Sequence, residues 1–207
     1  EYSILILSDR GVDKTHVPIP SLLAASSVHH HLIREGTRSK IGIVLESGEP
    51  REVAHFALLF GYGVGAVNPY LAFETLKEMS SQGFLPKTLN HKQAESRFIR
   101  SINKGVVKIM SKMGISTLQS YRGAQIFEVV GLSQKFVDKY FTWTPSRIGG
   151  IGLNEIEKEC RIRHSTAYPD LNRNEYVELI PGGNYQWRRD GEYHMWNPET
   201  ITKLQHA

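Results

Sequence analysis

The feature that most constrains the fold is a unit that recurs in the first third of the chain: a short apolar run, a polar turn and then a helical stretch. Residues 3–7 (Ser-Ile-Leu-Ile-Leu) form an unbroken apolar run, which is typical of a parallel strand buried on both faces. A turn at 8–11 follows. Pro18 and Pro20 then precede a predicted helix over 21–35, for which Gly36 is a suitable C-terminal cap.

The same order repeats twice more before residue 82. The pattern predicts strands over 41–45 and 65–67 and helices over 51–60 and 70–81. Strands that alternate with helices at this spacing favour a parallel sheet with right-handed crossovers. The predicted fold class is therefore α/β, with parallel strands and crossover helices forming a partial barrel-like or an open sheet.

The rhythm changes after a loop at 82–90. We predict a long helix over 92–113, although Gly105 lowers its helix propensity. The remaining predictions are a short strand at 115–121, helices at 124–130, 133–139 and 154–164, turns at 149–152, and a last helix opening at 197. Residues 1–166 are interpreted as the α/β portion, and 167–207 as an extended C-terminal connector.

Composition excludes several classes of protein. The 207 residues carry a formal net charge of +4, but Lys and Arg are dispersed, so a nucleic-acid-binding role is not indicated. No apolar run is long enough to span a membrane. Cys160 is the only cysteine, which rules out an intrachain disulfide and fits a reducing cytoplasm; we interpret it as an ordinary helix residue.

Polar residues follow each of the three predicted strands, where sites of parallel α/β proteins gather. A ligand or a neighbouring domain can supply their partners; alternatively, they cap the following helices and pair with one another. The candidates at this edge are Ser8, Asp9, Arg10, Glu46, Ser47 and Asn68.

A second polar cluster lies where the long predicted helix meets the next element. It can bind an anion or seat a partner loop, or it can simply satisfy backbone groups at the junction. Its members are Ser116, Gln119, Ser120, Tyr121 and Arg122.

Two other motifs carry less weight. His29, His30 and His31 point about 100° apart on a helix, so they cannot bind one metal ion together, and we assign no metal site. The glycine-rich stretches 61–65 and 149–152 do not follow a strand and open a helix, as a dinucleotide-binding loop does, so both are interpreted as turns.

Several long motifs resemble the central domain of the glutamate synthase large subunit, in order and over nearly the whole chain. They are the stretches 6–11, 18–24, 28–36, 46–53, 61–72, 108–128 and 187–192. The resemblance implies a parent polypeptide with a glutaminase domain, this α/β domain, an FMN-binding barrel and a β-helix. In that family, ammonia released from glutamine passes through a tunnel and reacts with 2-oxoglutarate, and the central domain links the two active sites and helps to wall the tunnel.

The departures from the family's full pattern set the expectations for this chain. It has neither the amino-terminal catalytic cysteine nor the iron–sulfur cysteines, so no catalytic, cofactor-binding or metal residue is carried over. FMN and an iron–sulfur cluster are implied for the parent enzyme alone. The implied partners are the glutaminase and FMN domains of the same polypeptide and, for the parent, a small reductase subunit or ferredoxin.

Two alternatives remain open: an independent small-ligand enzyme using Ser8, Asp9, Arg10, Glu46 and Asn68, or a docking module. The chain begins at Glu1 directly before a strand, which favours a piece of a longer polypeptide that is inactive alone. Such a piece is expected to expose apolar surface that its neighbours cover. The candidates for that surface are Tyr185, Trp187, Tyr193 and Trp196, all in the predicted connector.

Overall fold

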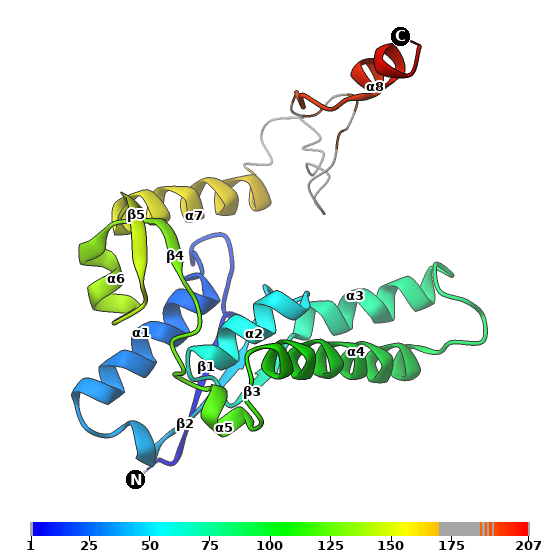
Figure 1. Cartoon of the computed structure of the whole chain (residues 1–207). Coiled ribbons are helices and arrows are strands. Elements are labelled where there is room, and N and C mark those ends of the chain that lie inside the picture. The colour runs from blue at the N-terminus through cyan, green and yellow to red at the C-terminus, as the bar shows by residue number, and fades with distance from the viewer. Residues whose placement is uncertain (1, 170–186, 188, 190, 192, 207) are drawn as a thin grey trace. The chain divides into compact units, whose positions relative to one another are not determined.

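A computed structural model describes residues 2–169, 187, 189, 191 and 193–206 (Figure 1). The chain divides into two compact units, Glu1–Tyr168 and Pro169–Ala207, and each is considered by itself. The first unit holds all the strands that the structure describes. In the second, Tyr185 lies outside the described residues, while Trp187, Tyr193 and Trp196 are exposed.

The first unit contains an open three-stranded parallel sheet in the order β1 (Ile4–Ser8), β2 (Gly42–Glu46) and β3 (Ala66–Asn68). Helix α1 (Ser21–Arg34) crosses from β1 to β2, and α2 (Val53–Gly61) crosses from β2 to β3. In the register, Ser8 lies beside Glu46, and Glu46 lies beside Asn68. The predicted α/β class is confirmed, and of its two forms the structure has the open sheet.

One face of this sheet forms a core with α1 and α2. Ile43 and Leu45 are almost fully buried there, against Ala25 of α1 and Leu59 of α2. Strand residues alternate between faces, so Val44 points the other way and is only half-buried. The packing of α1 and α2 on one face of the sheet therefore fixes the positions of the three strand ends.

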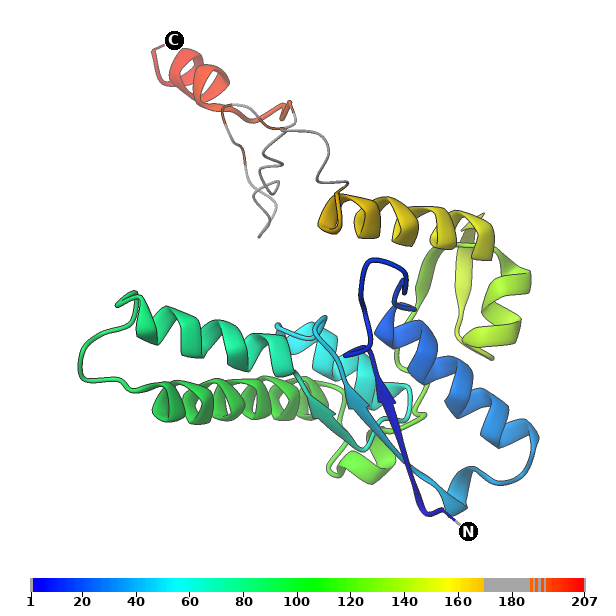
Figure 2. The same cartoon turned by 180° about the vertical axis from the view of Figure 1, so that it is seen from behind.

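The prediction that the first strand is buried on both faces is wrong. Ile4 and Ile6 expose 60% and 61% of their surface. The physical reason is that β1 is an edge strand and that, among the described residues, no helix covers the face opposite α1 and α2 (Figure 2). An apolar strip of a parallel sheet is thus left open to solvent.

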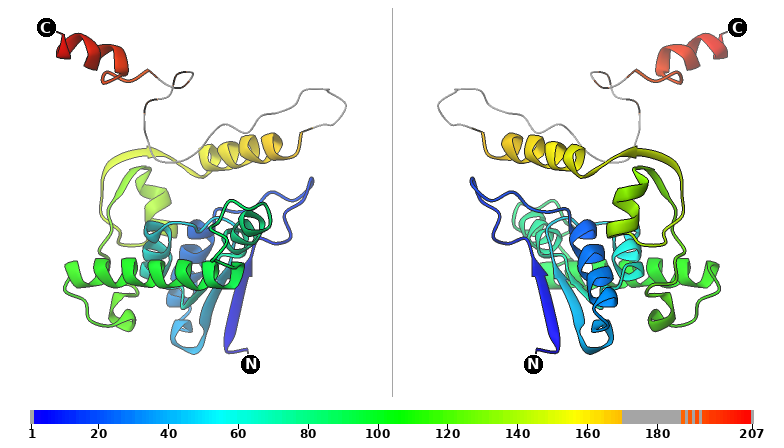
Figure 3. Two further views of the ribbon diagram at one scale, coloured as in Figure 1. Left: turned by 90° about the vertical axis from the view of Figure 1, so that its right-hand side faces the viewer. Right: turned by 90° about the vertical axis from the view of Figure 1, so that its left-hand side faces the viewer.

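A pair of helices packs next to α2 through α4. Helices α3 (Tyr70–Ser81) and α4 (His91–Lys112) lie side by side (Figure 1), and α4 is unbroken through its whole length (Figure 3). Gly105 does not interrupt α4. A Cβ at Gly105 would lie 2.5 Å from Val53, so this glycine allows α2 and α4 to approach closely.

Residues 115–151 differ most from expectation. The predicted strand at 115–121 is instead a one-turn helix, α5 (Leu118–Tyr121), because the Thr117 side chain caps it and accepts from the Ser120 N–H. The predicted helix at 124–130 and the predicted turns at 149–152 are both wrong: β4 (Val129–Leu132) and β5 (Ser146–Ile151) pair as a second parallel sheet. The two backbones approach so closely at Gly131 and Gly150 that a Cβ on Gly150 would clash.

The remaining helices match the sequence pattern. Helix α6 (Gln134–Tyr140) packs Phe136 and Val137 against α1, with Tyr62 and Phe141 in the same cluster. Helix α7 (Leu153–Ala167) follows β5. A 3-10 turn that the sequence pattern did not predict, η1 (Arg38–Lys40), precedes β2. In the second unit, α8 (Pro198–Gln205) begins at Asn197, whose side chain accepts from the Thr200 N–H.

Candidate functional site

The carboxyl ends of the three strands bring one group of predicted residues together around a single carboxylate. Glu46 accepts hydrogen bonds from Ser8 Oγ at 2.7 Å and from Arg10 Nε at 2.7 Å. Asn68 Nδ2 donates to the same carboxylate at 3.3 Å. The parallel register makes this possible, because it sets Ser8, Glu46 and Asn68 beside one another. Each side chain in this group thus has a partner within the group.

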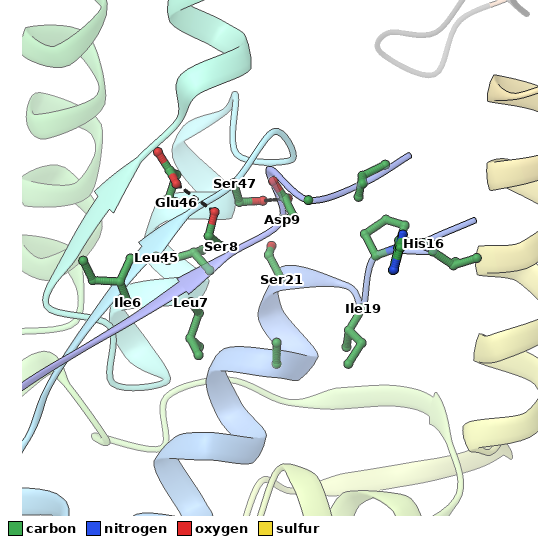
Figure 4. A pocket seen from close by; sticks show the side chains of 15 residues that line it. Ile6, Leu7, Ser8, Asp9, His16, Ile19, Ser21, Leu45, Glu46 and Ser47 are labelled. Atoms are coloured by element: carbon green, nitrogen blue, oxygen red, sulfur yellow. Dashed lines mark hydrogen bonds between the residues drawn. The ribbon is translucent and has the colours of Figure 1, made fainter. Parts of the chain in front are cut away.

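Asp9 and Ser47 form a second group at the same edge. Ser47 is buried, and its Oγ donates to Asp9 at 2.6 Å and accepts from the Glu49 N–H at 3.1 Å. The Gly48 N–H also donates to the Asp9 carboxylate, at 3.1 Å. These bonds hold the turn after β2 against the end of β1 (Figure 4). Asp9 and Ser47 therefore satisfy buried polar groups of the turn.

Arg10 connects this edge to α3. Its guanidinium lies 4.1 Å from the centre of the Tyr70 ring and 3.5 Å from Glu74. Hydrogen bonds from Arg10 and Ser8 hold the pKa of Glu46 below its usual value. Burial, with a smaller contribution from Asp9, raises the pKa of Tyr70 to about 12. Glu46 is thus ionised and Tyr70 protonated at neutral pH, and neither is poised to exchange a proton there.

A cavity of about 430 Å³ adjoins this edge, between the strand ends, the start of α1 and the loop that carries His16 and Ile19 (Figure 4). Its size suits a small ligand. The polar atoms that Ser8, Asp9 and Glu46 present at its wall are already hydrogen-bonded within the protein. A ligand would have to compete with those bonds.

The second predicted cluster is divided by the fold. Tyr121 is fully buried, and its hydroxyl donates to the Ala57 carbonyl at 3.0 Å. Thr117 caps the short helix and its hydroxyl donates to Ser120 Oγ at 3.0 Å, and Ser116 lies exposed just before this cap. Gln119 and Arg122 instead line a different pocket, where Arg122 Nη2 donates to Gln119 Oε1 at 2.5 Å.

That pocket, of about 650 Å³, lies at the amino end of β2, opposite the polar edge. Sequence reasoning identified Gln119 and Arg122 but missed the residues before β2 that complete it. Arg38 donates to His29 Nδ1 at 2.8 Å and to the carbonyls of Ile41 and Gly63 at 2.6 Å each. Burial, then the charge of Arg38, lowers the pKa of His29 to about 4. The available signal was the pair of basic residues Arg38 and Lys40 just before the second predicted strand, but it does not reveal that Arg122 is close.

The other motifs take structural positions. Gly63, in the glycine-rich stretch, has φ +97°, and a Cβ there would clash with the ring of His29. His55 Nδ1 accepts from the Arg51 N–H at 3.2 Å. Within the described ranges, no three His, Cys, Asp or Glu side chains are grouped to hold a metal ion, and no helix is long and apolar enough to cross a bilayer.

These features define a class: a parallel α/β domain with one sheet face open and with strand-end polar groups that pair with each other. A family described as "Glutamate synthase central domain" matches residues 1–133. The chain belongs to this family.

Individual relatives extend the similarity over the rest of the sequence. The glutamate synthase [NADPH] large chain of Bacillus subtilis is 52% identical over 206 residues, which cover 99% of this chain and 13% of the relative. Glutamate synthase [NADH] of Schizosaccharomyces pombe is 40% identical over 100% of this chain and 10% of its own length. The ferredoxin-dependent glutamate synthase of Pyropia yezoensis is 41% identical over 99% and 14%. The chain thus spans a small part of each relative.

Proposed function

We propose that this chain is the central domain of a glutamate synthase, that it links the glutaminase domain to the FMN domain, and that it helps to wall the ammonia passage between them. By itself it catalyses no step. Family membership and a chain that spans 13% of its Bacillus subtilis relative support a role within a larger polypeptide. The electron donor is left open, because the relatives include NADPH, NADH and ferredoxin types.

The observation that carries the proposal is the open sheet face. A parallel sheet is normally covered on both faces, because its strands are apolar on both. Here Ile4 and Ile6 leave more than half of their surface exposed, beside a half-buried Val44. In the parent polypeptide, another domain packs on this apolar strip and covers the second face of the sheet.

The polar edge supports a structural role for this domain. Arg10 forms an ion pair with Glu46 at 2.7 Å, and the Asp9 carboxylate accepts hydrogen bonds from Ser47 and Gly48. An iron–sulfur cluster does not fit this chain, which has one cysteine. The 430 Å³ cavity presents polar atoms that are already paired, which is a poor fit for FMN. We therefore place both cofactors in other parts of the parent enzyme.

The test uses the full-length enzyme that contains this sequence. Ile4→Glu and Ile6→Glu together put two charges on the open strip, where burial against a second domain would be costly. We expect glutamine hydrolysis and ammonia-dependent glutamate synthesis to persist, while the glutamate formed per glutamine hydrolysed falls and free ammonia rises.

The control is Val107→Glu on α4, a residue that is 59% exposed and lies away from the strip. This variant is expected to keep normal coupling. Unchanged coupling in the double Ile variant would overturn the linking role. Micromolar FMN binding by the 207-residue chain would separately overturn the claim that it is non-catalytic by itself.

A further inference from the structure

The pocket at the amino end of β2 gathers three cationic side chains from two places in the sequence. Arg38 and Lys40 come from the turn before β2, and Arg122 follows α5. None of the three forms an ion pair with an acidic residue in the part of the chain that the structure describes. The pocket wall is therefore positively charged, and no acidic residue lies among the described residues that line it.

Arg38 is held in place by neutral partners alone. Its Nε donates to His29 Nδ1, and its two terminal nitrogens each donate to a carbonyl oxygen, of Ile41 and Gly63. These bonds use three of its N–H groups, and a guanidinium has further donors. Burial and the nearby charge of Arg122 lower the pKa of Arg38, which is the effect expected of a cation without a counter-charge.

His29 adds a hydrogen-bond donor to the pocket, the Nε2–H of its imidazole ring. Since its Nδ1 accepts from Arg38 and its pKa is about 4, the ring is neutral at pH 7 and carries its proton on Nε2. That N–H has no hydrogen-bond partner among the residues described. On the other wall, Gln119 Oε1 accepts from Arg122, so its amide NH₂ is also left to donate.

From this arrangement we infer that the pocket binds a small oxyanion, phosphate or carboxylate, through Arg38, Arg122, His29 and Gln119. An oxyanion accepts hydrogen bonds from planar guanidinium groups and neutralises their charge. The site lies at the end of the sheet opposite Glu46, so it is separate from the strand-end groups. It does not rest on the proposed function.

The experiment titrates the chain with sodium phosphate and, in parallel, with sodium acetate at constant ionic strength. Chemical shifts of the His29 ring and the Arg side chains report binding. We expect a saturable shift at His29 with at least one of the two anions, and the comparison shows which class is preferred.

Arg122→Gln removes one charged donor. Among the described residues, the Arg122 side chain donates a hydrogen bond only to exposed Gln119, so the fold is expected to persist. Binding should weaken about tenfold, as the loss of a charge-assisted hydrogen bond predicts. Lys108→Gln, on the exposed surface of α4, removes the same charge outside the pocket and is expected to leave binding unchanged. The proposal is overturned if neither anion shifts His29, or if both variants weaken binding equally.

Discussion

The two ends of the three-stranded sheet deal with charge in opposite ways. At the carboxyl end, Glu46 has Arg10, Ser8 and Asn68 as partners, so the charges there are balanced by the protein itself. At the amino end, the partners of Arg38 among the described residues are a neutral imidazole and two carbonyls. Parallel α/β proteins usually have their active site at the carboxyl ends of the strands, but here the polar groups at that end are hydrogen-bonded to one another. The opposite end has hydrogen-bond donors that are available to a ligand.

The two ends also depend on different kinds of packing. The carboxyl end is held by side-chain hydrogen bonds across strands. At the amino end, the backbone of Gly63 packs directly against the ring of His29. Substitutions at the two ends test this difference.

The largest effect is expected from Gly63→Ala at the amino end. A Cβ there would clash with His29, and φ is +97°, a conformation that L-residues rarely adopt. Overpacking and backbone strain together should lower the free energy of unfolding by about 3–4 kcal/mol, measured by urea denaturation.

The matched control is Gly114→Ala, which has φ +72° but no atom within 4 Å of the added Cβ. Only the backbone strain applies there, so a loss of about 1–2 kcal/mol is expected. Equal losses in the two variants would mean that the contact between Gly63 and His29 is not tight.

At the carboxyl end, Ser47→Ala is expected to cost about 2 kcal/mol. It removes a donor to the Asp9 carboxylate and leaves the Glu49 N–H without its acceptor, at a position where Ser47 is buried. Ser111→Ala on the exposed surface of α4 should change the unfolding free energy little. A Ser47 variant as stable as the Ser111 variant would show that this end does not rely on its hydrogen bonds.

The third prediction concerns pH at the amino end. Burial lowers the pKa of His29 from 6.5 to about 4, so between these values the unfolded chain binds a proton that the folded chain excludes. The free energy of unfolding therefore falls as the pH decreases from 6.5 towards 4. Allowing for solvent screening, the loss from this group should be about 1 kcal/mol by pH 5.

His29→Gln should lessen this loss, and His31→Gln, an exposed residue on the same helix, should not. Urea midpoints measured at pH 7.5 and pH 5 check both variants. The same pH dependence in all three proteins would rule out His29 as its source.

The residues at the carboxyl end of the sheet can be predicted from the sequence, whereas those at the amino end cannot, for a physical reason. Strands β1 and β2 are continuous apolar runs, so their ends, and with them Ser8 and Glu46, can be placed from the sequence. The amino-end pocket depends on contacts from Arg38 to His29, on the preceding helix, and to Gly63, after the following helix. No local sequence pattern encodes these contacts.

The second sheet shows a related limit. Gly149 and Gly150 resemble a turn, yet both lie in β5, and the backbone of β4 approaches Gly150 closely at Gly131. The exposure of Ile4 and Ile6 likewise could not be foreseen, since an unbroken apolar run is the same whether one face of the sheet is covered or both.

The smallest effect is expected from Glu46→Gln at the carboxyl end. Arg10 and Glu46 are both partly exposed, and ion pairs of this kind contribute little and are screened by salt. Arg10 and Ser8 depress the pKa of Glu46, so its contribution is present above pH 4.5 and is lost as the pH falls through the lowered value. The urea midpoints of the parent chain and Glu46→Gln should therefore differ slightly at pH 7 and converge at low pH. A larger difference than that of Ser47→Ala, insensitive to salt, would mean that Glu46 is more enclosed than the open sheet face allows.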